Sequence, residues 1–186
     1  MSRFDLSKSL AAGPVRVHLG GEVSAPGWIN VNPKAGPHVD IRGDHRRLAL
    51  FPPGSVSAIY ASHVIEHLDP RTEMNEALAL FLRVLRPGGL LMASVPDLPV
   101  LCRFYCDASL SARDRGLVMR MMFGGHIDEF DIHHSGFDEE GLRDLLLGAG
   151  FAQVKRVDDF GLFEDTSLLK LYDVPVSLNV VATKPL

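Results

Sequence analysis

The middle of the chain carries the feature that most constrains its fold: an apolar strand, an amphipathic helix and a second apolar strand in succession. Residues 56–61 and 90–95 are short apolar runs, typical of parallel strands whose two faces are both covered by helices. Between them, apolar residues recur at helical spacing from Met74 to Leu85, after Asp69, which we expect to be the N-cap. This unit predicts two parallel strands joined by a crossover helix.

Patterns on either side extend this unit into a sheet. The other expected elements are strands at 15–19, 28–32, 39–41, 152–157 and 177–183, and helices at about 111–123 and 138–149. Only residues 22–27 separate the first two strands, so the first crossover is too short for the usual helix. The last two strands have no full helix between them, which predicts a hairpin and one antiparallel strand. The expected fold class is α/β, an open and mostly parallel sheet.

Length and charge restrict the functions open to this chain. The 186 residues suffice for one domain, expected to span residues 1–186 with 1–14 as an N-terminal extension. A formal charge of −4 offers no basic surface for a phosphate backbone, which disfavours nucleic acid as a partner. No apolar run is long enough to span a membrane, and no signal peptide is evident, so we expect a cytoplasmic protein. Cys102 and Cys106, four residues apart, would share a face on a helix, and we expect them to be reduced and half-buried.

Three stretches of the sequence carry a resemblance to a known family. They are Ile-Tyr-Ala-Ser-His-Val-Ile-Glu-His-Leu at 59–68, Arg-Val-Leu-Arg-Pro-Gly-Gly-Leu-Leu at 83–91 and Ser-Val-Pro-Asp at 94–97. Together they resemble the class I S-adenosylmethionine-dependent methyltransferases, in particular the small "type 11" predicted methyltransferases. Weaker similarity continues through residues 119–125, 134–137 and 149–151. The resemblance implies a Rossmann-like methyltransferase sheet and S-adenosyl-L-methionine as cofactor.

The resemblance also implies a set of cofactor-binding residues at the ends of strands. The glycine-rich loop falls on Gly20 and Gly21, where the lack of a Cβ lets the cofactor approach closely. The family's second loop glycine is replaced by Glu22, and its acidic residue for the ribose hydroxyls is replaced by Asn32. The remaining implied cofactor residues are Asp44 toward the adenine, the backbone of His45 beside it, and Ser62 and His63 on the pocket floor.

The sequence His63-Val-Ile-Glu66-His67 also matches the H-x-x-E-H pattern of inverted zinc proteases. On a helix the two histidines would share a face and hold zinc, with Glu66 as base. The residues before the pattern end a strand, and Asp69 and Pro70 begin a new helix directly after it. Too little helix remains to display the pair, so we predict no metal here.

A second cluster, between residues 125 and 134, combines three histidines with three acidic side chains. It follows the fifth strand and its helix, where this fold places its substrate lid. His133 or His126 is the expected general base, oriented by Asp131 or Asp128. Two other readings remain open: a divalent metal held by His and Asp, and a polar loop whose histidines satisfy backbone groups.

These observations predict a methyltransferase that acts on a small or sugar-like acceptor, by O-methylation in glycan or polysaccharide biosynthesis. Such a short chain has little of its own to build an acceptor pocket, so the site is either open or completed by a homodimer partner. The alternative is a catalytically silent binding or assembly subunit, favoured by Glu22 and Asn32. A nicotinamide-dependent dehydrogenase is disfavoured because Gly-x-Gly-x-x-Gly and its helix are both missing.

Overall fold

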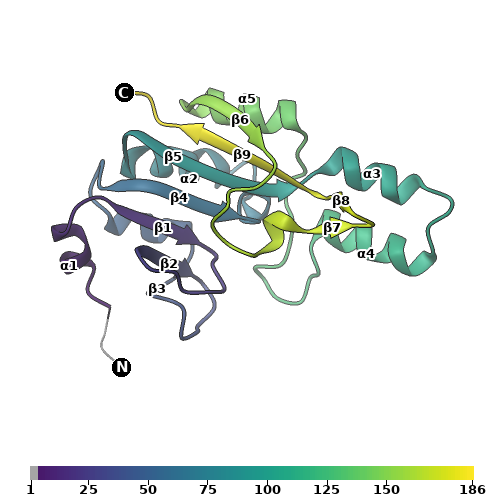
Figure 1. The fold of residues 1–186 in the computed structure, drawn as a ribbon, viewed down its shortest axis with the longest axis horizontal. Coiled ribbons are helices and arrows are strands. Elements are labelled where there is room, and N and C mark those ends of the chain that lie inside the picture. Colours follow the sequence, from purple (N-terminus) through teal and green to yellow (C-terminus); the bar gives the residue numbers. More distant parts are fainter. Residues whose placement is uncertain (1–3) are drawn as a thin grey trace.

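The computed structural model describes residues 4–186, and the predicted strand–helix–strand unit lies at the centre of its sheet (Figure 1). Strand β4 (Val56–Ser62) pairs in parallel with β5 (Leu85–Pro96), and helix α2 (Met74–Val84) connects them. The apolar stripe of α2 is buried, which confirms the crossover predicted from helical periodicity.

The complete sheet has seven strands in the order β3-β2-β1-β4-β5-β9-β6. The remaining strands are β1 (Val15–Leu19), β2 (Trp28–Asn32), β3 (Ile41–Arg42), β6 (Ala152–Val157) and β9 (Ser177–Thr183). Strand β9 runs antiparallel to both of its neighbours, β5 and β6, and the other pairings are parallel. The predicted α/β sheet with one antiparallel C-terminal strand is confirmed.

Several element boundaries differ from the sequence-based expectation for local reasons. Helix α2 begins at Met74 and not directly after Asp69, because the Asp69 carboxylate caps a separate turn by accepting hydrogen bonds from the Arg71 and Thr72 amides. Helix α1 (Leu6–Ala11) lies within the expected N-terminal extension, where Asp5 caps it. Helix α3 (Leu98–Cys106) was not predicted.

Helix α3 carries both cysteines, as expected of residues four apart, but the expectation that they are half-buried is wrong. Cys102 and Cys106 are both exposed, since α3 extends past the end of the sheet and packs mainly on α4 (Ala112–Phe123) (Figure 1). Among residues 4–186, no helix is long and apolar enough to cross a membrane.

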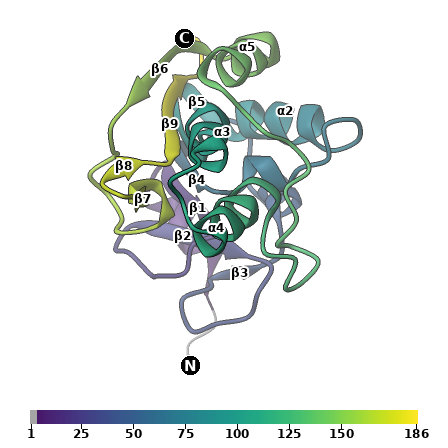
Figure 2. The ribbon, with the colours of Figure 1, turned by 90° about the vertical axis from the view of Figure 1, so that its right-hand side faces the viewer.

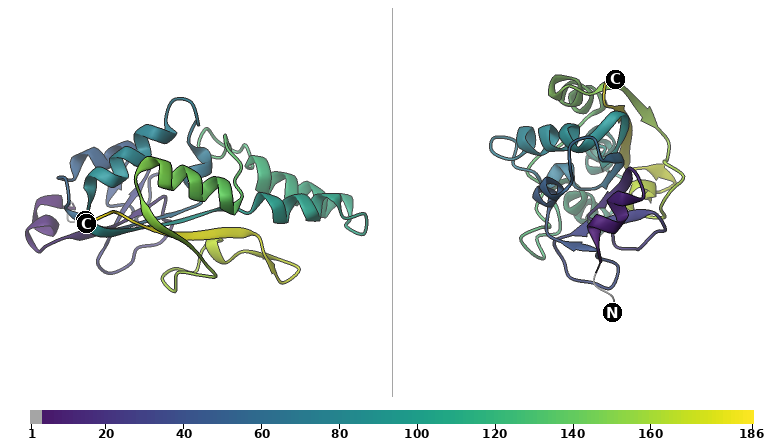
Figure 3. Two further views of the ribbon diagram at one scale, coloured as in Figure 1. Left: turned by 90° about the horizontal axis from the view of Figure 1, so that it is seen from above. Right: turned by 90° about the vertical axis from the view of Figure 1, so that its left-hand side faces the viewer.

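The two faces of the sheet are covered in different ways, so the expectation of helices on both faces is wrong. Helices α1, α2 and α5 (Glu139–Ala149) pack on the face that carries the main apolar core (Figure 3). Within residues 4–186, the opposite face is covered only by the connection between β6 and β9, with the small hairpin of β7 (Lys170–Leu171) and β8 (Val174–Pro175). Strand β1 passes to β2 through residues 20–27 with no helix, as the short spacing predicts.

An aromatic cluster takes the place of a helix on this second face. His18 of β1 and Tyr60 of β4 alternate with residues of the main core, so both point to the opposite side. The His18 ring lies 4.2 Å from the Phe163 ring and 5.0 Å from the Tyr60 ring, measured between centroids. The Tyr60 hydroxyl donates a 2.9 Å hydrogen bond to Asp165, which fixes the covering segment to the sheet.

The buried His18 predicts a pH-dependent stability. Burial lowers the pKa of His18 to about 4, so the unfolded chain binds its proton more readily than the folded one between about pH 6.5 and pH 4. The free energy of unfolding should therefore fall as pH drops through this window, by up to about 3 kcal/mol from this residue.

Urea unfolding at several pH values measures the effect. The His18→Phe variant should lose this part of the pH dependence, whereas the exposed-site variant His126→Phe should keep it. Parallel pH profiles for the wild type and His18→Phe would contradict the assignment.

Candidate functional site

A cavity of about 420 Å³ lies at the carboxyl ends of β1, β2 and β4. Strand order reverses here, because the chain leaves β1 toward β2 on one side and β4 toward β5 on the other. The loops after these strands therefore diverge and leave a crevice, the usual ligand site of an open α/β sheet. Its volume is within the range of about 300–1,000 Å³ typical of small-molecule pockets.

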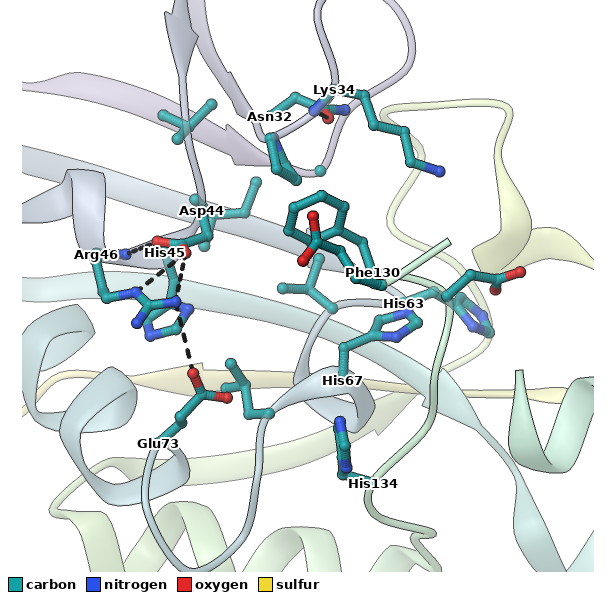
Figure 4. Close-up of a pocket in the computed structure, with 18 of the residues that line it drawn as sticks. Asn32, Lys34, Asp44, His45, Arg46, His63, His67, Glu73, Phe130 and His134 are labelled. Atoms are coloured by element: carbon teal, nitrogen blue, oxygen red, sulfur yellow. Dashed lines mark hydrogen bonds and ion pairs between the residues drawn. The ribbon is translucent and has the colours of Figure 1, made fainter. Parts of the chain in front are cut away.

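Most of the predicted cofactor residues meet in this cavity. Those that line it are Gly20, Glu22, Asn32, Asp44, His45 and His63 (Figure 4). Gly21 and Ser62 do not line it, and the Ser62 hydroxyl instead lies 3.4 Å from that of Thr166 on the second face of the sheet. Among the lining residues that the sequence did not indicate for this pocket are Lys34, Arg46, His67, Glu73, Phe130 and His134.

The two loop glycines have different structural roles. Gly20 has a φ of +72°, and an added Cβ would lie 3.1 Å from a methyl group of Val64. Gly21 packs against the buried imidazole of His18, and a Cβ there would lie only 2.5 Å from Nδ1. Gly20 thus keeps the cavity wall open, while Gly21 allows the aromatic cluster beneath it.

The side chain of Asn32 holds the glycine loop in place. Its Nδ2 donates a 2.9 Å hydrogen bond to the Gly21 carbonyl, which also accepts a 2.8 Å bond from Asn30. Its Oδ1 accepts a 2.8 Å bond from the Lys34 amide and retains a second lone pair. The substitution of an amide for the family's carboxylate supplies a donor toward Gly21 that a carboxylate lacks.

Ion-paired side chains that begin just after β3 form one wall of the cavity. Asp44 caps a short 3-10 helix (His45–Leu50), and its carboxylate accepts a 2.7 Å bond from the Arg46 guanidinium. That guanidinium also lies 3.6 Å from Glu73, as the dashed lines of Figure 4 show. Partial burial raises the pKa of Asp44, but its bonds to Arg46 outweigh this and hold the pKa below its usual value. Asp44 is therefore ionised at neutral pH.

The segment 124–136, here the lid loop, closes another side of the cavity. The His134 amide donates a 2.8 Å hydrogen bond to the main-chain carbonyl of Glu66, which anchors the loop to the segment after β4. Lys34 forms a 2.8 Å ion pair with Asp128 of the loop, and this hydrogen bond raises the pKa of Lys34. Figure 4 shows Phe130 projecting among Asn32, His63 and His67.

Of the three residues predicted to be catalytic, only Asp131 lines the cavity. His126 is exposed, and its Nε2 lies 2.9 Å from the Phe123 carbonyl. His133 is half-buried behind the cavity wall, and its Nδ1 lies 3.2 Å from the Met122 carbonyl. Burial lowers the pKa of His133. His134 lines the cavity instead, one residue beyond the predicted base, a difference that sequence alone could not resolve within two adjacent histidines.

His63 marks the end of β4, where its φ of +52° turns the chain. Its Nδ1 lies 3.0 Å from a Glu66 carboxylate oxygen, and its Nε2 lies 3.0 Å from the Ser177 hydroxyl. Glu66 is fully buried, and burial by itself would raise the pKa of its carboxyl. The neighbouring His63 and His67 together outweigh burial and hold this pKa below its usual value.

These residues fit S-adenosyl-L-methionine in shape and chemistry. The open wall at Gly20 admits a close approach, Glu22 offers a carboxylate to a positively charged group, and Asn32 Oδ1 keeps a lone pair for a hydroxyl. Asp44 presents an ionised carboxylate at the far end of the cavity.

Comparisons with known proteins agree with this geometry. Residues 12–156 match a protein family described as a methyltransferase domain. A S-adenosylmethionine-dependent methyltransferase from Archaeoglobus fulgidus has a similar fold, with 16% identity, a TM-score of 0.56, and coverage of 96% of this chain and 90% of that one. No functionally curated protein matches the sequence.

Two further solved structures have the same fold. One, a S-adenosylmethionine-dependent methyltransferase from Mesorhizobium loti, shows 20% identity, a TM-score of 0.53, and coverage of 95% of this chain and 96% of that one. The other is a 1,6-didemethyltoxoflavin-N1-methyltransferase from Burkholderia thailandensis with bound 1,6-didemethyltoxoflavin and S-adenosylhomocysteine. It shows 15% identity, a TM-score of 0.57, and coverage of 99% of this chain and 80% of that one.

The tight contact at Gly21 generates a stability prediction. Gly21→Ala should lower the free energy of unfolding by about 1–3 kcal/mol, because the new Cβ would overlap the buried His18 ring. The matched control is Gly116→Ala in α4, where an added Cβ meets nothing within 4 Å and should stabilise the helix by up to about 1 kcal/mol. Equal unfolding midpoints in urea for the two variants would contradict this account.

Proposed function

The chain belongs to the methyltransferase domain family, and from this membership we propose that it methylates a hydroxyl group of a small, sugar-like acceptor. The family supports an enzyme with S-adenosyl-L-methionine as its cofactor. The observation that carries the acceptor proposal is the polar character of the cavity wall formed by the lid loop, where Glu129, Asp131 and His134 line the same cavity as the cofactor residues. Carboxylate and imidazole groups suit an acceptor rich in hydroxyl groups.

Side chains along the ends of β1, β2 and β3 would hold the cofactor. Gly20 leaves room for its methionine part, and Glu22 faces the positive charge of its amino group or sulfonium. The free lone pair of Asn32 Oδ1 accepts a hydrogen bond from a ribose hydroxyl, and Asp44 accepts one from the adenine amino group. When bound, S-adenosyl-L-methionine supplies an electrophilic methyl group.

A hydroxyl acceptor loses its proton as it is methylated, so the site needs a base. Among the histidines of the lid loop, His134 lines the cavity, and its ring makes no hydrogen bond within residues 4–186. We place the base at His134 in preference to His133 and His126, whose ring nitrogens lie against main-chain carbonyls. Asp131, also in the cavity wall, binds a second hydroxyl and orients the acceptor.

The wider setting of the reaction is part of the same proposal. We place the enzyme in the cytoplasm, on a sugar-like intermediate of glycan or polysaccharide biosynthesis. Phe123 at the end of α4 and Ile127 of the lid loop are exposed apolar residues. A homodimer partner would cover them and complete the acceptor pocket.

Cofactor binding is tested by calorimetric titration with S-adenosylhomocysteine. The wild type should bind in the micromolar range, and Asp44→Ala should bind about tenfold more weakly because a charged hydrogen-bond acceptor is lost. Asp144→Ala, on the exposed face of α5, is the control and should bind as the wild type does.

Two outcomes of this titration would contradict the proposal. An unchanged affinity of Asp44→Ala would remove the adenine assignment. No detectable heat at millimolar ligand would favour a silent binding or assembly subunit.

The base is tested by the release of S-adenosylhomocysteine in the presence of a panel of monosaccharides and, as acceptors that lack a hydroxyl group, simple alkyl amines. Turnover should require a hydroxyl acceptor, and His134→Gln should lower it by about 10²–10⁴-fold while leaving S-adenosylhomocysteine affinity unchanged. His126→Gln should retain wild-type turnover. Equal losses in the two variants would show that the lid loop acts through its conformation and not through a base at His134.

A further inference from the structure

At the wall of the cavity, which His67 lines, the structure brings together three side chains that the sequence separates into two motifs. Glu66 and His67 follow β4, and His133 belongs to the lid loop. Each offers one potential ligand atom, and these three atoms all lie within 4.8 Å of one another. The rings of His67 and His133 meet edge to face, with their centroids 4.7 Å apart.

The carboxylate at the centre of this group is unusually poor in partners. Glu66 is fully buried, yet neither of its carboxylate oxygens accepts a hydrogen bond of normal geometry from residues 4–186. Oε1 lies 3.0 Å from Nδ1 of His63, as an ion pair, and Oε2 has no such neighbour among them. A buried charge without full compensation is costly, so the site favours a cation beside it.

Both histidines are already oriented as metal ligands usually are. Nδ1 of His67 lies 2.9 Å from the Ile132 carbonyl, and Nδ1 of His133 lies 3.2 Å from the Met122 carbonyl. A main-chain carbonyl accepts a hydrogen bond, so each Nδ1 carries the proton and each Nε2 keeps a lone pair. A bond of this kind from the second nitrogen to a carbonyl is the common way to fix a metal-binding imidazole.

The group of Glu66, His67 and His133 is not the set of residues that forms the H-x-x-E-H pattern of the sequence. His63 belongs to that pattern, but its Nε2 is directed to the Ser177 hydroxyl and its Nδ1 to Glu66. Residues Ile65–His67 form a single 3-10 turn, so His63 and His67 do not share a helical face. His133 takes the place of His63 in the group.

We propose that Glu66, His67 and His133 form a binding site for one divalent transition-metal ion of the zinc type. Two imidazoles and a carboxylate are a donor set that zinc accepts, with water as a fourth ligand. Zinc–ligand bonds of about 2.0–2.2 Å require the three atoms to move closer together than they are here. The lid loop supplies His133, and the turn after β4 supplies Glu66 and His67. The ion would therefore connect the loop to the sheet. This site does not depend on the proposed methyl transfer.

The test begins with the full chain stripped of metal by EDTA and dialysed against zinc chloride. We expect one bound zinc per chain by elemental analysis, and a thermal unfolding midpoint higher by about 5–10 °C at a zinc concentration 100-fold above the dissociation constant. Replacement of zinc by cobalt(II) should give the strong visible absorption of a four-coordinate site. This last measurement needs no variant and so does not depend on whether a variant folds.

Variants then locate the ion. His133→Ala and His67→Ala should lose the bound zinc and the cobalt absorption, with folding checked by circular dichroism. His126→Ala, an exposed histidine of the same loop, should keep both. Absence of stoichiometric zinc in the wild type, or equal loss in His126→Ala, would overturn the site. Cofactor titration of the same samples reports separately on the proposed function.

Discussion

The parallel pairing of β1 with β4 is the constraint on which the rest of the molecule depends. It places the carboxyl ends of both strands side by side, while the chain leaves them in opposite directions along the sheet. No side chain of the sheet itself can fill the space between the diverging loops, so a cavity forms there. The glycine loop, Asn32, the Asp44–Arg46 pair and His63 are all positioned by this one feature.

The missing helix after β1 changes the second face of the sheet without changing its topology. A short loop of residues 20–27 leaves apolar strand positions uncovered, and the long connection between β6 and β9 returns to cover them with Phe160 and Phe163 (Figure 2). His18 is buried against the rings of Phe163 and Tyr60, and Gly21 must lack a Cβ to accommodate it. Gly21 packs against the second face and its neighbour Gly20 lines the cavity, so one loop couples the packing of that face to the cavity wall.

Glu66 connects the lid loop to the segment that follows β4. Its main-chain carbonyl accepts hydrogen bonds from the His134 and Ser135 amides, and its buried carboxylate faces His63, His67 and His133. A residue with these contacts sets the position of the lid loop relative to the sheet. The base and the ligand proposed for the loop therefore depend on the same residue, His134 through the main-chain carbonyl of Glu66 and His133 through its carboxylate.

Periodicity and turn residues within the sequence determined the central sheet, the antiparallel last strand and the absence of a first crossover helix, because these follow from local spacing along the chain. Resemblance to a family implied eight cofactor residues, of which Gly21 and Ser62 do not line the cavity. The other six do: Gly20, Glu22, Asn32, Asp44, His45 and His63. Which of the lid-loop histidines faces that cavity, and which meets Glu66, was decided only by tertiary structure. Neighbouring residues in a loop have no fixed period, so their directions come from long-range contacts such as those of the His134 amide and the Met122 carbonyl.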